Sequence, residues 1–189
     1  MAKSRIVKHR AAALSVGDDV MDVIEIILED HKPLKALIKV IKNPDRPLSE
    51  RRAAFNKFAP LLIAHAKPEE KALYRFMKRD AGLRELGLEG DTEHALAEQL
   101  LGETEQTDAD DLFSARIKVL AELVEHHIAE EESKLFPELR RRISLEVRAT
   151  LADEYLISQQ EVETETQLFS RAERKSALRD QYPQPLQAH

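Results

Sequence analysis

The 189-residue chain contains no cysteine and no tryptophan, and it has only five glycines and three tyrosines. The absence of cysteine excludes disulfides, thiolate zinc sites, iron–sulfur clusters and cysteine nucleophiles. The shortage of glycine and of aromatic residues is typical of long helices rather than of many strands and turns. Because 42% of the residues are hydrophobic, the chain can still bury a core. Its length suits one domain, or one domain with an appendage.

Positive charge and long apolar segments are also scarce. The net charge of −6 gives no sign of the basic face typical of nucleic-acid binding, so we expect no nucleic-acid partner. No segment reaches the roughly twenty apolar residues of a membrane span, and the apolar run at residues 11–14 is too short for a signal peptide. We therefore expect no membrane contact, a cytoplasmic protein, and a flexible basic arm over residues 1–17. A transit peptide is the alternative for this arm, because it is basic and free of acidic residues.

One pattern of histidines and carboxylates occurs twice in the chain. Each copy has an acidic residue followed by a lone histidine and, thirty-odd residues later, a His-x-x-x-Glu-Glu block followed by leucine and an aromatic residue. The lone and the paired histidine are 34 residues apart in the first copy and 33 in the second. The matched spacing indicates that each half of the protein supplies half of one site. In order, the copies use Asp30, His31, His65 and Glu69, and then Glu93, His94, His127 and Glu131.

Hydrophobic periodicity predicts five helices. The first helix starts after a cap formed by Asp18 or Asp19, and the fourth starts after a cap formed by Thr107 or Asp108. Residues 82–90 contain three glycines and are expected to form a connector between the second helix and the third. The predicted helices cover about residues 19–42, 49–79, 91–106, 108–137 and 144–178.

Four helices joined by short links give antiparallel neighbours. This predicts an all-α fold, an up-down-up-down four-helix bundle over residues 18–143 with an additional C-terminal helix over residues 144–180. The apolar residues of that charged fifth helix are sparse, which favours a solvated helix packed on the bundle. A partner-binding or oligomerising arm is the alternative. Residues 181–189 are expected to be a disordered tail.

The paired residues of each copy can bind one ligand together. Residues i and i+4 of a helix lie on one face about 6 Å apart, so His65 and Glu69, like His127 and Glu131, present an imidazole and a carboxylate to one point. Both pairs lie in leucine-rich stripes, where a carboxylate is unfavourable unless it is paired or binds a metal. Mixed imidazole and carboxylate ligands suit iron, manganese or zinc better than calcium or magnesium. The predicted ligands of this two-metal site are His31, His65, Glu69, His94, His127 and Glu131.

The polar neighbours of these residues have more than one interpretation. His126 and Glu130 also form an i, i+4 pair, but His126 lies about 100° from His127 around the helix, so an exposed ion pair is favoured. The acidic residues beside the predicted ligands either accept a hydrogen bond from a ligand imidazole or are solvated. These residues are Asp30, Glu70, Glu93 and Glu132.

The order of histidine and glutamate distinguishes two kinds of diiron bundle. Ferritin-like carboxylate proteins use Glu-x-x-His, which does not occur in this chain. The blocks at residues 65–74 and 127–137 instead resemble the HHE cation-binding domain of the hemerythrin family, and the resemblance extends over residues 19–142. It implies a hemerythrin-like bundle in which the four histidines are terminal ligands and Glu69 and Glu131 are bridging carboxylates. The implied cofactor is two iron ions in an oxo- or hydroxo-bridged diiron centre, with manganese or zinc as alternatives.

One position departs from the oxygen-carrying members of that family. They have His-x-x-x-His on the third helix, whereas this chain has Glu98 four residues after His94, so Glu98 is a candidate seventh ligand. The resemblance implies a protein that binds or senses oxygen or nitric oxide, or that responds to iron and redox state, rather than a dedicated enzyme. The alternatives are a diiron oxidoreductase that consumes peroxide, oxygen or nitric oxide, and a metal-stabilised regulatory module. Such a module would use the C-terminal helix for a protein partner or for self-association.

Overall fold

The structure is a computed structural model that describes residues 20–168. These residues are helical apart from short links, and they contain no strand. Within residues 20–168, each half of the chain includes one π-helical turn, labelled η. In chain order the segments are α2 (Val23–Lys42), α3 (Leu48–Glu69), η2 (Glu70–Tyr74), α4 (Arg75–Met77), α5 (Arg84–Glu105), α6 (Asp110–Glu130), η3 (Glu131–Leu135), α7 (Phe136–Arg142) and α8 (Leu145–Leu168).

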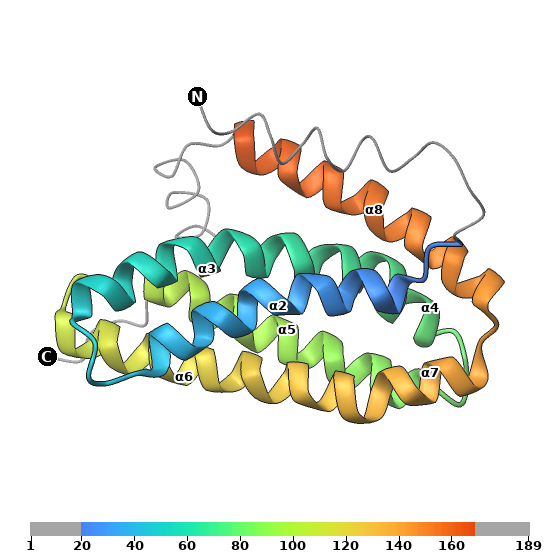
Figure 1. The fold of residues 1–189 in the computed structure, drawn as a ribbon, viewed down its shortest axis with the longest axis horizontal. Helices are drawn as coiled ribbons and strands as arrows, with labels where there is room; N and C mark the ends of the chain where they lie inside the picture. The colour runs from blue at the N-terminus through green and yellow to red at the C-terminus, as the bar shows by residue number, and fades with distance from the viewer. Residues whose placement is uncertain (1–19, 169–189) are drawn as a thin grey trace, which may run out of the picture.

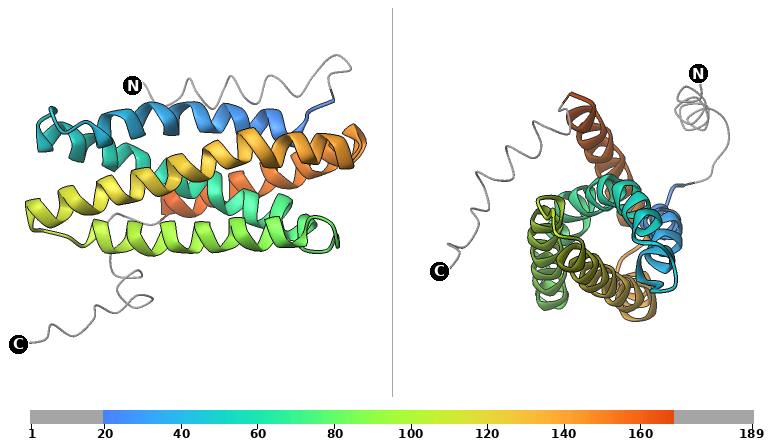
Figure 2. Two further views of the ribbon diagram at one scale, coloured as in Figure 1. Left: turned by 90° about the horizontal axis from the view of Figure 1, so that it is seen from below. Right: turned by 90° about the vertical axis from the view of Figure 1, so that its left-hand side faces the viewer.

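Four long helices lie side by side and surround the interior, and α8 lies outside them (Figures 1 and 2). Helix α2 contacts α3 and α6, α5 also contacts α3 and α6, and α8 packs mainly on α2, α3 and η2. The all-helical fold agrees with the predicted hemerythrin-like bundle and its additional C-terminal helix. The up-down-up-down order and the domain limits at residues 18 and 143 remain predictions. Within residues 20–168, every helix is too short or too polar to cross a membrane.

Two helices begin at other caps than those predicted from the sequence. Helix α2 is capped by Asp22, whose Oδ1 accepts a hydrogen bond from the Ile24 amide at 3.0 Å. The predicted cap residues at positions 18 and 19 lie outside the described residues. Helix α6 has Ala109 at its N-cap without a side-chain cap. Its predicted cap residue Thr107 instead donates to the Glu103 carbonyl at 2.8 Å, so this hydroxyl completes the end of the preceding helix.

The expected connector at residues 82–90 is wrong, because α5 already begins at Arg84. Two of its glycines lie inside the helix, where they allow close packing instead of a turn. A Cβ atom on Gly87 would lie 3.0 Å from Cβ of Met77. A Cβ atom on Gly90 would lie 2.6 Å from Cζ of Tyr74. The glycines therefore bring α5 close to the segment that follows α3.

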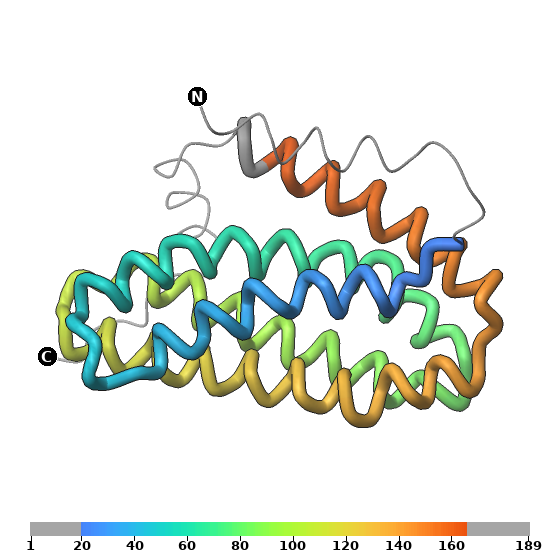
Figure 3. The backbone as a smooth tube through the Cα atoms, in the orientation of Figure 1, coloured from blue at the N-terminus to red at the C-terminus, as the bar shows by residue number. Residues whose placement is uncertain are grey.

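The two π-helical turns occupy matching positions in the two halves. Turn η2 starts directly after Glu69, and η3 starts at Glu131. The backbone passes from α6 through η3 into α7 along one side of the bundle (Figure 3). In an α-helix, residues five apart differ in direction by about 140°, whereas an i→i+5 turn brings them close to the same face. Each π-turn therefore directs a ligand glutamate and the aromatic residue that ends its block to the same side of the chain.

Two hydrophobic clusters fill the bundle on either side of the predicted metal ligands. In α2, Ile24 and Ile27 belong to one cluster, Leu34 and Ile38 belong to the other, and His31 lies between them. The same division occurs along the segment from α3 to η2 and along the segment from α6 to α7. The polar residues of the repeat thus form a layer inside an otherwise apolar interior.

The C-terminal helix is more firmly attached than its sparse apolar pattern indicated. Leu151, Ala152 and Tyr155 of α8 are buried and belong to one of the two hydrophobic clusters. Tyr155 is fully buried, and its hydroxyl donates to Asp30 at 2.9 Å. Gln159 donates to the same carboxylate at 2.8 Å. Helix α8 therefore packs on the bundle, as predicted, and it contacts the residue next to His31.

Candidate metal centre

The fold brings all six predicted ligands into one buried cage. Four separate helical segments supply the side chains: α2, α3, α5, and the junction of α6 and η3. All six residues are at most 5% exposed. The cage residues are His31, His65, Glu69, His94, His127 and Glu131.

The nitrogen and oxygen atoms of the cage are close enough to share cations. The cage contains three overlapping groups of three residues, and within each group one ligand atom per residue lies within 4.8 Å of the others. These groups are His31, His65 and Glu131; His65, Glu69 and His94; and Glu69, His127 and Glu131. All three groups share residues, so the cage offers more than one set of ligand atoms that could hold a cation.

Three of the four cage imidazoles are held from outside by a carboxylate. In each case the carboxylate contacts Nδ1, which leaves Nε2 on the side of the cage. His31 and His127 form a hydrogen bond there, whereas Nδ1 of His94 makes an ion-pair contact without a hydrogen bond. Of the two roles left open for Glu70, Glu93 and Glu132, these contacts favour a partner of a predicted ligand imidazole. The pairs are His31 Nδ1–Glu132 Oε1 at 3.0 Å, His94 Nδ1–Glu70 Oε1 at 3.3 Å and His127 Nδ1–Glu93 Oε2 at 2.6 Å.

Two of these pairs cross between the halves of the chain. Glu132 of the second half holds His31 of the first, and Glu70 of the first half holds His94 of the second. Asp30 has a different role, because it accepts hydrogen bonds from Tyr155 and Gln159 of α8.

The cage has an uneven distribution of charge. Burial raises the pKa of the Glu69 carboxyl well above its ordinary value, and the neighbouring Glu131 raises it further. Burial also raises the pKa of Glu131, but His127 and His31 lower it by more, so the net shift is downward. Burial and the nearby His31 lower the pKa of His65 well below its ordinary value. Without a cation, the cage therefore favours a protonated Glu69, an ionised Glu131 and a neutral His65.

Several buried atoms of the cage have no hydrogen-bond partner in the described protein. They include both carboxylate oxygens of Glu69, both ring nitrogens of His65 and Nε2 of His31. Nε2 of His94 and Nε2 of His127 face each other at 2.9 Å, although both rings already direct Nδ1 to a carboxylate. Buried polar atoms are rarely left without partners, and lone pairs that converge in this way require a proton or a cation between them. The residues present therefore fit a bound metal.

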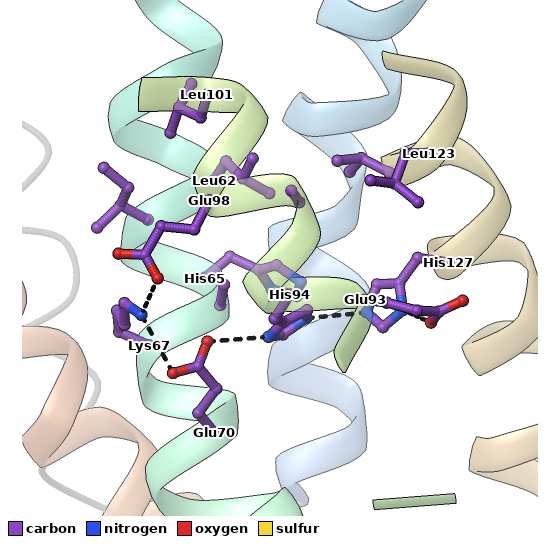
Figure 4. A pocket seen from close by; sticks show the side chains of 14 residues that line it. Leu62, His65, Lys67, Glu70, Glu93, His94, Glu98, Leu101, Leu123 and His127 are labelled. Carbon is purple, nitrogen blue, oxygen red and sulfur yellow. Dashed lines mark hydrogen bonds and ion pairs between the residues drawn. The ribbon is translucent and has the colours of Figure 1, made fainter. Parts of the chain in front are cut away.

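A small apolar cavity lies against one wall of the cage (Figure 4). Its volume is about 20 Å³, room for roughly one water-sized molecule. Seven of its fourteen lining residues are aliphatic, and His65, His94 and His127 form the wall shared with the cage. A second and larger pocket of about 210 Å³ reaches Tyr74, His127 and Glu131 from another side.

Two residues considered from the sequence lie apart from the cage. Glu98 accepts a hydrogen bond from Lys67 at 2.6 Å beside the apolar cavity, so it pairs with a cation of the protein instead of facing the cage (Figure 4). Lys67 also contacts Glu70 at 3.2 Å and thereby links this ion pair to the carboxylate that holds His94. His126 is 67% exposed and lies 3.7 Å from Glu130, as expected of an exposed ion pair.

One polar residue of the site was not predicted as a partner of the ligands. Tyr74 is fully buried, and its hydroxyl donates to Oε1 of Glu131 at 2.7 Å. Burial and the neighbouring Glu131 raise the pKa of Tyr74 well above its ordinary value, so the hydroxyl remains a donor. The Leu-Tyr end of the first block was visible in the sequence, but the π-helical turn that directs Tyr74 to the cage was not.

Comparison with known proteins identifies the domain. Residues 22–139 match the Hemerythrin HHE cation binding domain. The chain is also 27% identical over 160 residues to a protein named DNA nickase from Nostoc sp. (strain PCC 7120 / SAG 25.82 / UTEX 2576). That match covers 80% of this chain but 44% of the relative, so the chain spans less than half the length of the relative. No solved structure shows a significant match. The family match covers more than half of the chain and contains all six cage residues, and the protein therefore belongs to the hemerythrin HHE cation-binding family.

Proposed function

We propose that the protein is a non-heme diiron protein that binds or senses oxygen or nitric oxide, or that responds to iron and redox state. The observation that carries this proposal is the buried cage of four imidazoles and two carboxylates. Its unsatisfied oxygen and nitrogen atoms converge, and outer carboxylates orient three of the four rings. Imidazole and carboxylate ligands together suit iron, with manganese and zinc as the alternatives.

The chain's own residues would divide the work of such a centre. The four histidines would bind the ions through Nε2, and Glu69 and Glu131 would neutralise their charge between them. Glu70, Glu93 and Glu132 would fix the ring orientation and increase the basicity of the histidines. A bound pair of iron ions would supply redox activity and open coordination positions. The apolar cavity beside His65, His94 and His127 would keep bulk water away from a small uncharged ligand.

A regulatory role is the second candidate, and the contact between α8 and Asp30 favours it. Tyr155 donates to Asp30, and its hydroxyl also lies 3.4 Å from the carbonyl oxygen of His65. Helix α8 therefore contacts the backbone of one predicted ligand and the neighbour of another. A change in metal occupancy that moves His31 or His65 would alter the packing of α8, which a protein partner or a second copy could detect.

Two enzymatic functions are alternatives to this proposal, and each has its own assay. The diiron centre could consume peroxide, oxygen or nitric oxide, which turnover assays on the iron-loaded protein would detect. The name of the Nostoc relative adds DNA nicking as an activity to test. The cage is buried and the chain is acidic, so neither the access nor the charge favours a DNA substrate. Relaxation of a supercoiled plasmid by the metal-loaded protein, but not by a variant lacking His65, would overturn that preference.

The proposal is tested by visible spectroscopy of protein loaded anaerobically with ferrous iron. Exposure to oxygen or to nitric oxide should produce charge-transfer absorption at two irons per chain, and removal of the gas should reverse the change for a binder or sensor. Irreversible oxidation with release of product would favour the oxidoreductase. A protein that retains no iron after gel filtration would contradict the diiron proposal.

A further inference from the structure

The two halves of the cage are unequal at the aromatic residue that ends each block. Tyr74 ends the first block, and Phe136 ends the second. Each ring packs on the lone histidine of the opposite half. The Tyr74 and His94 ring centroids are 5.1 Å apart, and the Phe136 and His31 centroids are 5.9 Å apart. The two aromatic residues thus occupy equivalent places, and only one of them brings a hydroxyl group to the cage.

The hydroxyl of Tyr74 contacts a predicted metal ligand directly. It donates to Oε1 of Glu131 at 2.7 Å and lies 3.2 Å from Nε2 of His127. Oε2 of Glu131, by contrast, has no hydrogen bond, and it lies 3.2 Å from Nε2 of His31 and 3.5 Å from Nε2 of His127. Neither oxygen of Glu69 has a hydrogen-bond partner in the described protein. Glu131 therefore presents one unengaged oxygen to the cage, whereas Glu69 presents two.

The opposite wall is shaped to admit this tyrosine. Gly90 lies four residues before the lone histidine of α5, and a Cβ atom at this position would lie 2.6 Å from Cζ and 2.9 Å from the hydroxyl oxygen of Tyr74. The equivalent position four residues before His31 is Ile27, a fully buried residue in the same hydrophobic cluster as Phe136. The position four residues before the lone histidine is therefore large on the side of Phe136, and it is a glycine on the side of Tyr74. Glycine inside a helix is unfavourable, so its presence in α5 has a packing reason.

We propose that Tyr74 is a positioning residue that restricts Glu131 to one metal-facing oxygen and thereby makes the two cation positions of the cage chemically unequal. The proposal rests on the proposed function as a two-metal centre, and it adds which carboxylate is free to bridge with both oxygens. In this scheme Glu69 would be the carboxylate with both oxygens available to the ions. Glu131 would offer one oxygen, because the other accepts the hydrogen bond of Tyr74.

Cobalt(II) titration of the metal-free full-length protein tests this inference, because the intensity of cobalt(II) d–d absorption falls as the coordination number rises. The wild type should bind two cobalt ions per chain. Tyr74→Phe should also bind two, since Phe136 shows that phenylalanine fits the equivalent place. In Tyr74→Phe, the d–d absorbance of one of the two bound cobalt ions should be lower than in the wild type, because the released oxygen of Glu131 becomes an additional ligand of that ion. The affinity of that step should change by about tenfold or more, while the other step stays the same.

Two further variants separate positioning from a general loss of structure. Gly90→Ala should displace the Tyr74 ring and reproduce the spectrum of Tyr74→Phe, and the double variant should show no additional change. Thr104→Val removes another buried hydroxyl, one that donates to the Leu100 carbonyl instead of to a cage oxygen, so its cobalt spectrum should match the wild type. Identical spectra and affinities for Tyr74→Phe and wild type would overturn this inference alone. A wild-type protein that binds no cobalt would overturn the two-metal function together with it.

Discussion

The change from Glu69 to glutamine should have opposite effects on the metal-free and the metal-loaded protein. Glu69 is fully buried, both of its oxygens lack hydrogen-bond partners, and Glu131 lies beside it. Burial and then Glu131 raise the pKa of Glu69, so the folded metal-free protein holds a proton that the unfolded chain releases. The stabilising effect of this proton is complete below the unfolded pKa near 4.5 and is lost as the pH rises toward the folded value.

The size of the effect follows from proton linkage. In the pH range where only the folded state holds the proton, the wild type loses about 1.4 kcal/mol of unfolding free energy per pH unit. Glutamine has nearly the same shape and no proton to lose, so the variant escapes this loss. For a protein of this size, the difference corresponds to about 3–6 °C in melting temperature per pH unit. The metal-free variant should therefore become progressively more stable than the wild type above pH 5.

Urea unfolding of the metal-free proteins, followed by circular dichroism at several pH values from 5 to 8, measures this difference. Glu163→Gln, an exposed substitution of the same kind on α8, is the control and should track the wild type at every pH. With saturating zinc the order should reverse. Free metal at 1,000 times its Kd adds about 4 kcal/mol to the wild type, and the glutamine variant should gain less. A difference between Glu69→Gln and wild type that stays constant with pH would refute the assignment of a protonated, buried Glu69.

Three other predictions address the ligands, the C-terminal helix and the metal. His65→Ala and Glu131→Ala should each reduce the bound metal, measured by elemental analysis, and lower the melting temperature. His126→Ala should change neither. Unchanged metal content in the first two variants would show that the ligand assignment is wrong. Tyr155→Phe should destabilise the protein by about 1 kcal/mol in urea unfolding, because the partly buried carboxylate of Asp30 loses one donor. No measurable loss would argue against this contact between α8 and the bundle. Removal of metal by a chelator should lower the melting temperature, and adding the metal back should restore it. The same melting temperature before and after chelation would contradict the claim that the metal binds only the folded state.

The sequence predicted the cage because its information is local and repeated. His65 and Glu69 lie at i, i+4 on one helix, and two copies with nearly equal spacing leave few arrangements that could satisfy both carboxylates. The resemblance to the family then assigned roles to all six residues. Contacts between distant segments were harder to predict, such as Glu132 with His31 and Glu70 with His94. Their residues were candidates, but spacing along one helix does not indicate which carboxylate reaches which ring.

The remaining errors have two physical causes. Glycines were interpreted as chain-breaking residues, whereas Gly87 and Gly90 lie within α5 and leave space for Met77 and Tyr74. A pattern of residues cannot distinguish these roles, because each depends on what packs against the glycine. The π-helical turns also leave no signal in an apolar pattern that assumes 100° per residue. Helix α8 packs on the bundle as predicted, but its few apolar residues did not indicate the buried tyrosine and the hydrogen bonds to Asp30 that contribute to this packing.

The central claim is that the cage holds two iron ions that react with a small gas. The most direct measurement is elemental analysis together with a visible spectrum of the full chain purified in air. Our account predicts two irons per chain and ferric absorption bands that bleach on reduction and return on exposure to oxygen. A colourless protein with zinc at both positions, or one that contains no stoichiometric metal, would contradict it.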